Sequence, residues 1–190
     1  MPVIALINEE KGLRYDTEES IRYLIHYIFA VYKTGYDDIR PGHMIGDFLG
    51  CAPFFGTPCQ EIMDDLVSDQ MIANNRTYGK TESNLIKHRV ISFDESDFVM
   101  PDEAFRLARH VANAYGENYI TAYAVHLDTK KIHIHFAVNT IGWKEGKRFD
   151  KSFELKWLWR MVNSWGKSRD DRFVNDPRSW ERNLGYYGTW

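Results

Sequence analysis

Three histidines in the second half of the chain have the type and spacing that suit a metal ion. One residue separates His133 from His135, and His126 precedes them by one short loop. Imidazole nitrogens bind many divalent metals, and three protein ligands leave coordination positions open for a substrate. The pattern predicts a catalytic metal site rather than a closed structural one.

The segment that carries two of these histidines alternates like a β-strand. Apolar residues take every second position from Ile132 to Val138, so His133, His135 and Asn139 share the other face. Asn139 is therefore expected beside the metal site. Solvated surface histidines are the alternative interpretation, but three histidines that converge on one face make it the weaker one.

A second predicted strand, residues 119–127, supplies the third histidine. If residues 128–131 form the hairpin loop, His126 lies directly opposite His133 and faces the same side of the sheet. A loop one residue longer or shorter would turn His126 to the other face. Asp128, at the start of the loop, is placed to accept a hydrogen bond from one of the imidazoles.

A helix near the N-terminus carries two tyrosines on one face. Apolar residues recur there at helical spacing, and the helix is expected to begin at Asp16 and to end at Gly35. Tyr23 and Tyr27 lie four residues apart. Ordinary amphipathic packing is the alternative interpretation for either ring.

The remaining pattern mixes helices and strands with short antiparallel connections. It predicts an α+β fold, a central antiparallel β-sheet with flanking helices in a two-layer sandwich. At 190 residues one domain is expected. Residues 36–56 show no periodicity and are expected to form an irregular insertion. Further strands are predicted at residues 3–7 and 85–93, and further helices at 57–74, 101–115 and 152–165.

Composition limits the classes of protein that fit. Two cysteines are too few for a disulfide framework, and no apolar run could cross a membrane, so a cytoplasmic location is expected. The net charge of −3 is unusual for a protein that binds nucleic acid non-specifically. A DNA enzyme with this charge must concentrate its basic residues where the phosphates lie.

The histidine segment resembles the third motif of the HUH endonucleases. It is most similar to the relaxases of mobilisable plasmids and integrative elements, the P-type mobilisation proteins and their Gram-positive relatives. Lys131 stands where many relatives carry a further histidine, and residues 36–56 have no familiar counterpart. The resemblance rests on His126, Asp128, His133, His135 and Asn139, on Tyr27-Ile28 followed by Lys33-Thr34, and on Tyr78-Gly79-Lys80, Lys87-His88 and Gly146-Lys147-Arg148.

The resemblance implies a conjugative relaxase, which nicks one DNA strand at a transfer origin and later rejoins it. A tyrosine would attack the phosphorus and form a 5′-phosphotyrosine adduct. Tyr27 matches the nucleophile position of the family best. The alternatives left open are Tyr23 and His26, with Tyr15, Tyr32 and Tyr36 behind them.

The same resemblance implies a divalent metal ion and a DNA partner. Mg²⁺ or Mn²⁺ is expected, and Zn²⁺ or Ni²⁺ could occupy the site in crystals. The partners would be single-stranded DNA at the origin and other proteins of the transfer complex. Relaxases commonly carry further domains, so the chain is expected to be the N-terminal part of a longer protein.

Two groups of basic residues are expected to contact DNA phosphates. The first follows the histidine strand and is the preferred one. A solvated face is the alternative interpretation for both groups. His88 lies in an otherwise apolar strand, where a site residue and a core histidine are equally open. The groups are Lys144, Lys147, Arg148 and Lys151, and Lys80, Lys87 and Arg89.

Three other functions remain open from the sequence. A replication initiator of the HUH superfamily would share the chemistry, but there the histidine pair precedes the nucleophile. A nucleic-acid-binding module would use the sheet without catalysis. A metal hydrolase without a role in DNA would suit the acidic charge, although the motif lacks an obvious glutamate base.

Overall fold

The computed structural model describes residues 2–7, 14–30, 46–49, 60–97, 99–149 and 153–167. Within these ranges a five-stranded sheet has the strand order β1-β3-β5-β4-β2, and every neighbouring pair is antiparallel. The two longest strands, which include the histidines, therefore lie inside the sheet. The strands are β1 (Val3–Leu6), β2 (Gly46–Leu49), β3 (Ile86–Ser92), β4 (Tyr119–His126) and β5 (His133–Gly142).

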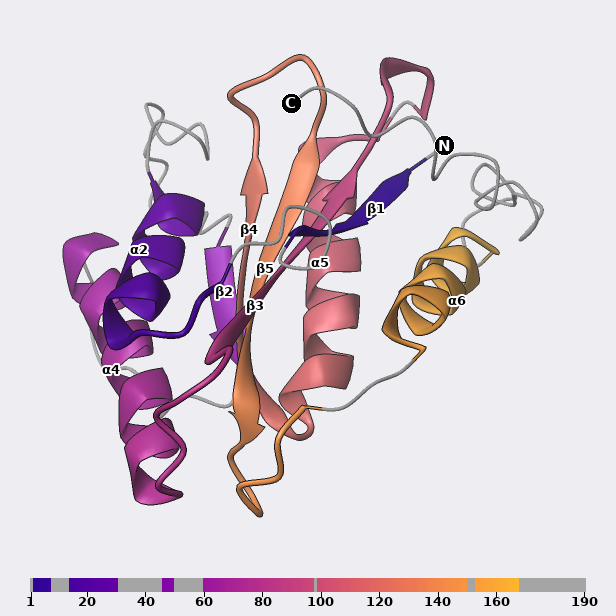
Figure 1. The fold of residues 1–190 in the computed structure, drawn as a ribbon. Coiled ribbons are helices and arrows are strands. Elements are labelled where there is room, and N and C mark those ends of the chain that lie inside the picture. The colour runs from indigo at the N-terminus through magenta and orange to yellow at the C-terminus, as the bar shows by residue number, and fades with distance from the viewer. Residues whose placement is uncertain are drawn as a thin grey trace.

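Helices cover both faces of this sheet (Figure 1). The pair α2 and α4 packs on one face, and the pair α5 and α6 packs on the other. The α+β class with a central antiparallel sheet and flanking helices is confirmed, but the sheet is the middle of three layers rather than one of two. The helices are α2 (Glu18–Phe29), α4 (Gln60–Thr77), α5 (Pro101–Gly116) and α6 (Glu154–Lys167), with a short 3₁₀ turn, η1 (Glu95–Asp97).

The two faces of the sheet differ in the size of their side chains. Large residues such as Tyr123 and Phe136 are fully buried under α5 and α6. On the other face Ala122, Ala124 and Ala137 are fully buried under α2 and α4. Because alanine occupies little volume, α2 can approach the strands that carry the histidines. The histidine face is thus a second core and not a solvated surface.

Helix α2 begins one residue later than the sequence indicates. Thr17, rather than Asp16, is the N-cap, and its side chain accepts a hydrogen bond from the Ser20 amide. Glu18 and Glu19 follow in the first turn, where negative charge favours the helix dipole. The helix ends at Phe29, and the predicted end at Gly35 lies outside the described residues.

The largest difference from expectation lies in residues 36–56. Gly46–Leu49 form the edge strand β2, which pairs with β4, so the prediction of irregular structure is wrong for these four residues. The rest of the stretch lies outside the described residues, as do Thr57 and Pro58 at the predicted start of the next helix. An isolated four-residue strand has too little pattern to be recognised without its partner strand.

Two glycines with positive φ, one after α4 and one in the turn after β5, allow a matched test of backbone strain against side-chain overpacking. Gly79 has φ +60° with no atom within 4 Å of an added Cβ, whereas Gly146 has φ +63° and its added Cβ would lie 2.3 Å from the Tyr78 ring. We expect Gly79→Ala to cost about 1–2 kcal/mol, from backbone strain alone. Gly146→Ala should cost roughly 1–3 kcal/mol more, because the added methyl group overpacks the ring.

Urea unfolding of the two variants measures both effects. Equal losses of stability would show that the Tyr78 ring moves aside without cost. The structure opposes that outcome, because the Tyr78 hydroxyl lies 3.1 Å from the carbonyl oxygens of Trp143 and Lys144.

Candidate metal centre and nucleophile

The β4–β5 hairpin brings the three histidines together. In its register His126 is paired with His133, and Ala124 with His135, as the loop over residues 128–131 predicts. One ring nitrogen from each of the three histidines lies within 4.8 Å of the other two. His126 is fully buried and His135 nearly so, while His133 lies at the partly exposed end. The donor set is therefore one that could bind a divalent metal ion.

Backbone carbonyls orient two of the imidazoles. His126 Nε2 donates to the Ile28 carbonyl at 2.8 Å, and His133 Nδ1 donates to the Lys131 carbonyl at 2.8 Å. A carbonyl can only accept, so the proton positions are Nε2 of His126 and Nδ1 of His133. The lone pair then lies on Nδ1 of His126 and on Nε2 of His133. Both rings are held in a form that can bind a metal.

Another imidazole, not a carbonyl, holds the third histidine. His135 Nδ1 lies 2.7 Å from His88 Nε2, and the two rings stack at 5.0 Å between centroids. His88 is 6% exposed and lies on β3, two positions from the residue paired with His135. Of the two interpretations left open for His88, the structure favours contact with the histidine cluster.

The two polar residues expected beside the histidines have different surroundings. The Asp128 carboxylate lies 3.8 Å from His133 Nε2, the ring nitrogen that does not bond to the Lys131 carbonyl. It thus adds negative charge near the three nitrogens, while the Lys131 carbonyl orients the ring. Asn139 donates to the Met71 carbonyl at 3.3 Å. It therefore links α4 to β5 four residues beyond His135, at about 13 Å along the strand, and does not touch the imidazoles.

Helix α2 places one tyrosine against the cluster. The Tyr27 ring lies 5.5 Å from the His135 ring and 5.8 Å from the His126 ring between centroids, both in edge contacts. The Ile28 carbonyl that receives the His126 proton belongs to the last turn of α2, where carbonyls have no partner within the helix. This hydrogen bond fixes the end of the tyrosine helix directly to one of the three clustered histidines.

The two main alternatives to Tyr27 are largely exposed to solvent. Tyr23 is 67% exposed. The His26 side chain is 77% exposed, and its Nδ1 lies 3.0 Å from an Asp64 carboxylate oxygen on α4. Helical geometry turns each residue about 100° from its neighbour, which separates His26 from Tyr27.

Tyr15, one of the lower-ranked alternatives from the sequence, also lies at this site. Its ring lies 6.4 Å from the His88 ring. Burial raises the pKa of the Tyr15 hydroxyl, and nearby Tyr23 and Tyr27 raise it further. With a raised pKa, Tyr15 forms its phenolate less readily than an exposed tyrosine does. It lies before α2 in a segment without periodicity, so the sequence gives no reason to rank it above the other tyrosines.

Comparison with known proteins bears out the resemblance to the relaxases. Residues 56–165, more than half of the chain, match the family of MobA/VirD2-like relaxases over their nuclease domain. The chain belongs to this relaxase family. It is also 30% identical over 88 residues to the Protein rlx of Staphylococcus aureus, an alignment that covers 46% of this chain and 26% of that protein. The matched family region includes the three histidines and His88 but not α2.

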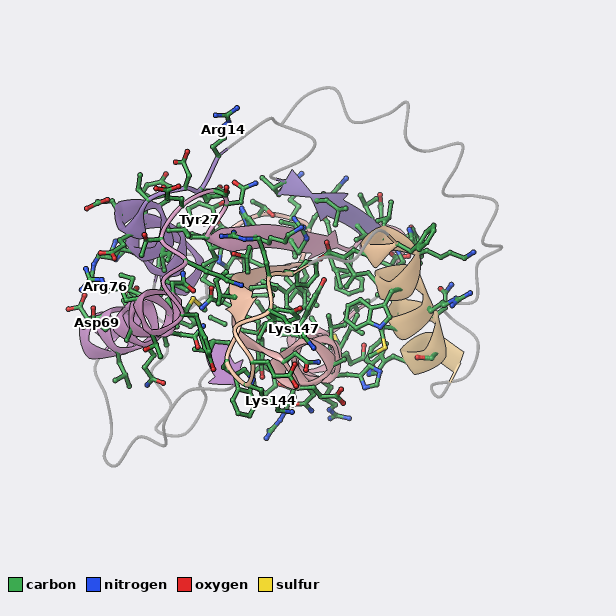
Figure 2. All side chains as sticks on the ribbon, turned by 60° about the horizontal axis from the view of Figure 1, so that its bottom comes forward. Arg14, Tyr27, Asp69, Arg76, Lys144 and Lys147 are labelled. Carbon is green, nitrogen blue, oxygen red and sulfur yellow. The ribbon has the colours of Figure 1, made fainter. Side chains whose placement is uncertain are left out.

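The basic group that the sequence analysis favours as the DNA contact lies at the end of the sheet opposite the histidines. Figure 1 shows the 127–132 loop and the 143–149 turn at opposite ends of β5. At about 3.3 Å per residue, His135 and Gly142 are about 23 Å apart along the strand. Figure 2 shows Lys144 and Lys147 together at that distant end. These lysines are therefore not neighbours of the histidines.

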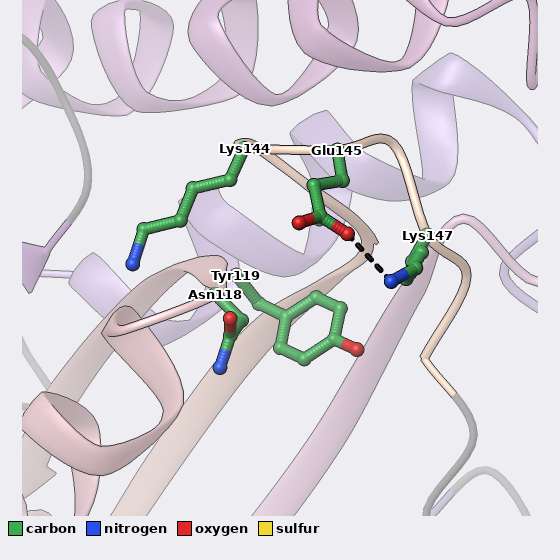
Figure 3. Close-up of a pocket in the computed structure, with 6 residues that line it drawn as sticks. Asn118, Tyr119, Lys144, Glu145 and Lys147 are labelled. Carbon is green, nitrogen blue, oxygen red and sulfur yellow. Dashed lines mark ion pairs between the residues drawn. The ribbon is translucent and has the colours of Figure 1, made fainter.

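A pocket lies among the residues of this distant end (Figure 3). Lys147 Nζ is 2.6 Å from a Glu145 carboxylate oxygen, and this contact lowers the pKa of Glu145 and raises that of Lys147. The Glu145 carboxylate offsets part of the positive charge that would attract a DNA phosphate to this end. The pocket is lined by Asn118, Tyr119, Gly142, Lys144, Glu145 and Lys147.

Other predicted DNA contacts are engaged within the protein. Lys80 donates to the Gly146 carbonyl, and Arg148 donates to the carbonyls of Glu82 and Asn84. Both side chains therefore link the loop after α4 to the 143–149 turn. Lys87 lies over the Phe149 ring, 3.8 Å from a carboxylate oxygen of α6. Lys151 lies outside the described residues.

The predicted DNA contact of Arg89 is wrong. Its guanidinium is 0% exposed and makes two 2.8 Å hydrogen bonds to Glu154. Strand alternation is the reason, because His88 faces the histidine cluster and its neighbours must face the α5–α6 core. The Tyr115 hydroxyl also donates to Glu154, at 2.7 Å.

Within the described residues, no helix of the relaxase domain is long and apolar enough to cross a membrane.

Proposed function

We propose that this relaxase domain nicks and rejoins one strand of DNA at a transfer origin, with Tyr27 as the nucleophile. The observation that carries the proposal is the contact of the Tyr27 ring with His126 and His135. It puts a phenol beside a donor set that suits a metal ion. The whole protein's activity is also a proposal, because the chain covers only about a quarter of the Staphylococcus relative.

The chemistry is a transesterification that conserves phosphodiester bonds. The Tyr27 oxygen loses its proton and bonds to the phosphorus, and the bond from phosphorus to the 3′ oxygen breaks. That oxygen takes up a proton and leaves as the free 3′-hydroxyl of the upstream piece, so the downstream piece stays on the protein through its 5′ phosphate as a phosphotyrosine. Attack by a 3′-hydroxyl reverses the step and rejoins the strand.

The residues proposed to hold the metal are His126, His133 and His135, with the Asp128 carboxylate nearby. Mg²⁺ or Mn²⁺ is the proposed ion. When bound, it would polarise the scissile phosphate and offset its charge. The chain itself holds the imidazoles in metal-binding form through the carbonyls of Ile28 and Lys131, and it holds Tyr27 through the docking of α2.

Metal binding predicts a measurable gain in stability. Mn²⁺ at about one hundred times its Kd should stabilise the protein by about 2.7 kcal/mol, a rise in Tm of roughly 5–10 °C. His133→Ala should abolish this rise, because the side chain is only 16% exposed and faces the site. His110→Ala is the control, since that histidine is exposed on α5. A rise that persists in His133→Ala would remove this histidine from the site.

A covalent-capture experiment tests the proposed reaction. The wild-type protein is incubated with Mn²⁺ and a random-sequence single-stranded DNA library, then denatured, and the DNA that remains attached is sequenced. We expect attached DNA with a shared sequence and a free 3′-hydroxyl on the released piece, both lost in EDTA. Binding without attachment would favour a binding module, and cleavage without attachment would favour a hydrolase. Either result would overturn the proposal.

The remaining parts of the proposal follow from the DNA substrate. The strand to be transferred lies in the bacterial cytoplasm, which is where we place the domain. Other proteins of the transfer complex would present the origin in single-stranded form. Lys144 and Lys147 could contact the strand several nucleotides from the cut, given their distance of about 23 Å from the histidines along β5.

A further inference from the structure

The hydrogen-bond partner of His135 differs in kind from those of the other two histidines. His126 and His133 donate to backbone carbonyls, which can only accept. His135 Nδ1 faces His88 Nε2 at 2.7 Å, and an imidazole nitrogen can either donate or accept. The direction of this one hydrogen bond therefore decides which nitrogen of His135 has a lone pair.

Only one direction is compatible with metal binding through the nitrogen that faces away from His88. If His135 Nδ1 donates to His88 Nε2, the lone pair of neutral His135 lies on Nε2, toward the cluster. If His88 Nε2 donates instead, neutral His135 carries its proton on Nε2 and has no lone pair to offer there. A metal at the cluster thus requires His88 to act as an acceptor through Nε2.

His88 also contacts the tyrosines of the site. Its ring lies 6.0 Å from the Tyr27 ring at 72° and 6.4 Å from the Tyr15 ring at 70°, both edge contacts. At 6% exposure it is enclosed by these side chains. One side chain from β3 therefore touches a proposed metal ligand from β5 and the proposed nucleophile from α2.

We infer that His88 is a positioning residue, which holds His135 in its Nε2-binding tautomer and supports the Tyr27 ring against it. This inference rests on the metal site of the proposed function. Groups that orient metal-binding histidines in this way typically change metal affinity by 10- to 100-fold when they are removed. A histidine that only fills the core would change the stability of the metal-free protein instead.

Two substitutions separate these roles. In His88→Gln the side-chain carbonyl can still accept a hydrogen bond from His135 Nδ1, whereas in His88→Leu nothing can. We measure the Kd of Mn²⁺ by calorimetry, the visible spectrum of the Co²⁺ form, and the Tm of the metal-free protein. His88→Met is a second apolar variant in case His88→Leu does not fold, and His110→Gln is the control on the exposed side of α5.

We expect His88→Leu to weaken Mn²⁺ binding by about 10- to 100-fold and to alter the Co²⁺ spectrum. His88→Gln should stay close to wild type in both, because it keeps the acceptor. Wild-type affinity in His88→Leu, or equal weakening in the two variants, would overturn the inference.

The wild-type measurements separate this inference from the proposed function. Metal binding without a DNA adduct would overturn nicking by Tyr27 and leave the role of His88 to be decided by the variants above. Absence of metal binding in the wild type would overturn the metal site and, with it, the inference about His88.

Discussion

Tyr27→Phe is expected to abolish the covalent protein–DNA adduct and to slow strand cleavage by at least about 10⁴-fold, the scale seen when a nucleophile is removed. The substitution removes one hydroxyl and keeps the aromatic ring. The edge contacts with His126 and His135 therefore remain, and the fold and metal binding should be unchanged. Initial rates of cleavage of a captured oligonucleotide, with adducts resolved on a denaturing gel, provide the measurement.

Three other variants show whether the effect is specific to Tyr27. Tyr23→Phe is the matched control, since Tyr23 lies one turn earlier on α2 and is 67% exposed. His26→Ala removes the histidine alternative, whose side chain is 77% exposed. Both should nick at the wild-type rate. Tyr15→Phe should reduce cleavage less than Tyr27→Phe. An adduct that persists in Tyr27→Phe would assign the nucleophile to another residue.

Glu154→Leu is expected to cost about 3–5 kcal/mol of stability, the largest loss we anticipate from a single change. Glu154 is 4% exposed at the start of α6 and accepts two hydrogen bonds from Arg89, which is fully buried on β3. Removal of the carboxylate leaves a buried guanidinium without its counter-charge. The Tyr115 hydroxyl, whose pKa burial and Glu154 raise well above its ordinary value, loses its acceptor as well.

The double variant Arg89→Met/Glu154→Leu should recover most of this loss, because well-packed apolar side chains can replace a buried ion pair at little cost. Urea unfolding measures all three proteins. Glu145→Gln is the matched control, since Glu145 pairs with Lys147 on an exposed turn and should change nothing measurable. A double variant as unstable as Glu154→Leu would show that the pair contributes specific geometry rather than charge compensation.

Local backbone geometry made much of the histidine cluster predictable from the sequence. Strand alternation alone places His133 and His135 on one face, and the hairpin loop then requires His126 to face them, as the register confirms. Helical spacing likewise separates His26 from Tyr27 by about 100°. These features depend only on neighbours along the chain, so a sequence suffices to predict them.

The tertiary structure alone decided which distant residues join that site. His88 reaches His135 because β3 pairs with β5, although the two strands are far apart in the sequence. Tyr27 faces the histidines because α2 docks on the small alanines of β4 and β5. The same packing buries Arg89 on the opposite face and puts Lys144 at the far end of the sheet.

The physical reason is that local periodicity and tertiary packing have different causes. Periodicity comes from the fixed dihedral angles of helices and strands, so it is visible in any short segment. Strand order and helix docking come from the burial of apolar surface between segments that are far apart in the sequence. No short segment shows which partner it will pack against. The sequence therefore determined three converging histidines, and the fold determined that His88 and Tyr27 stand beside them.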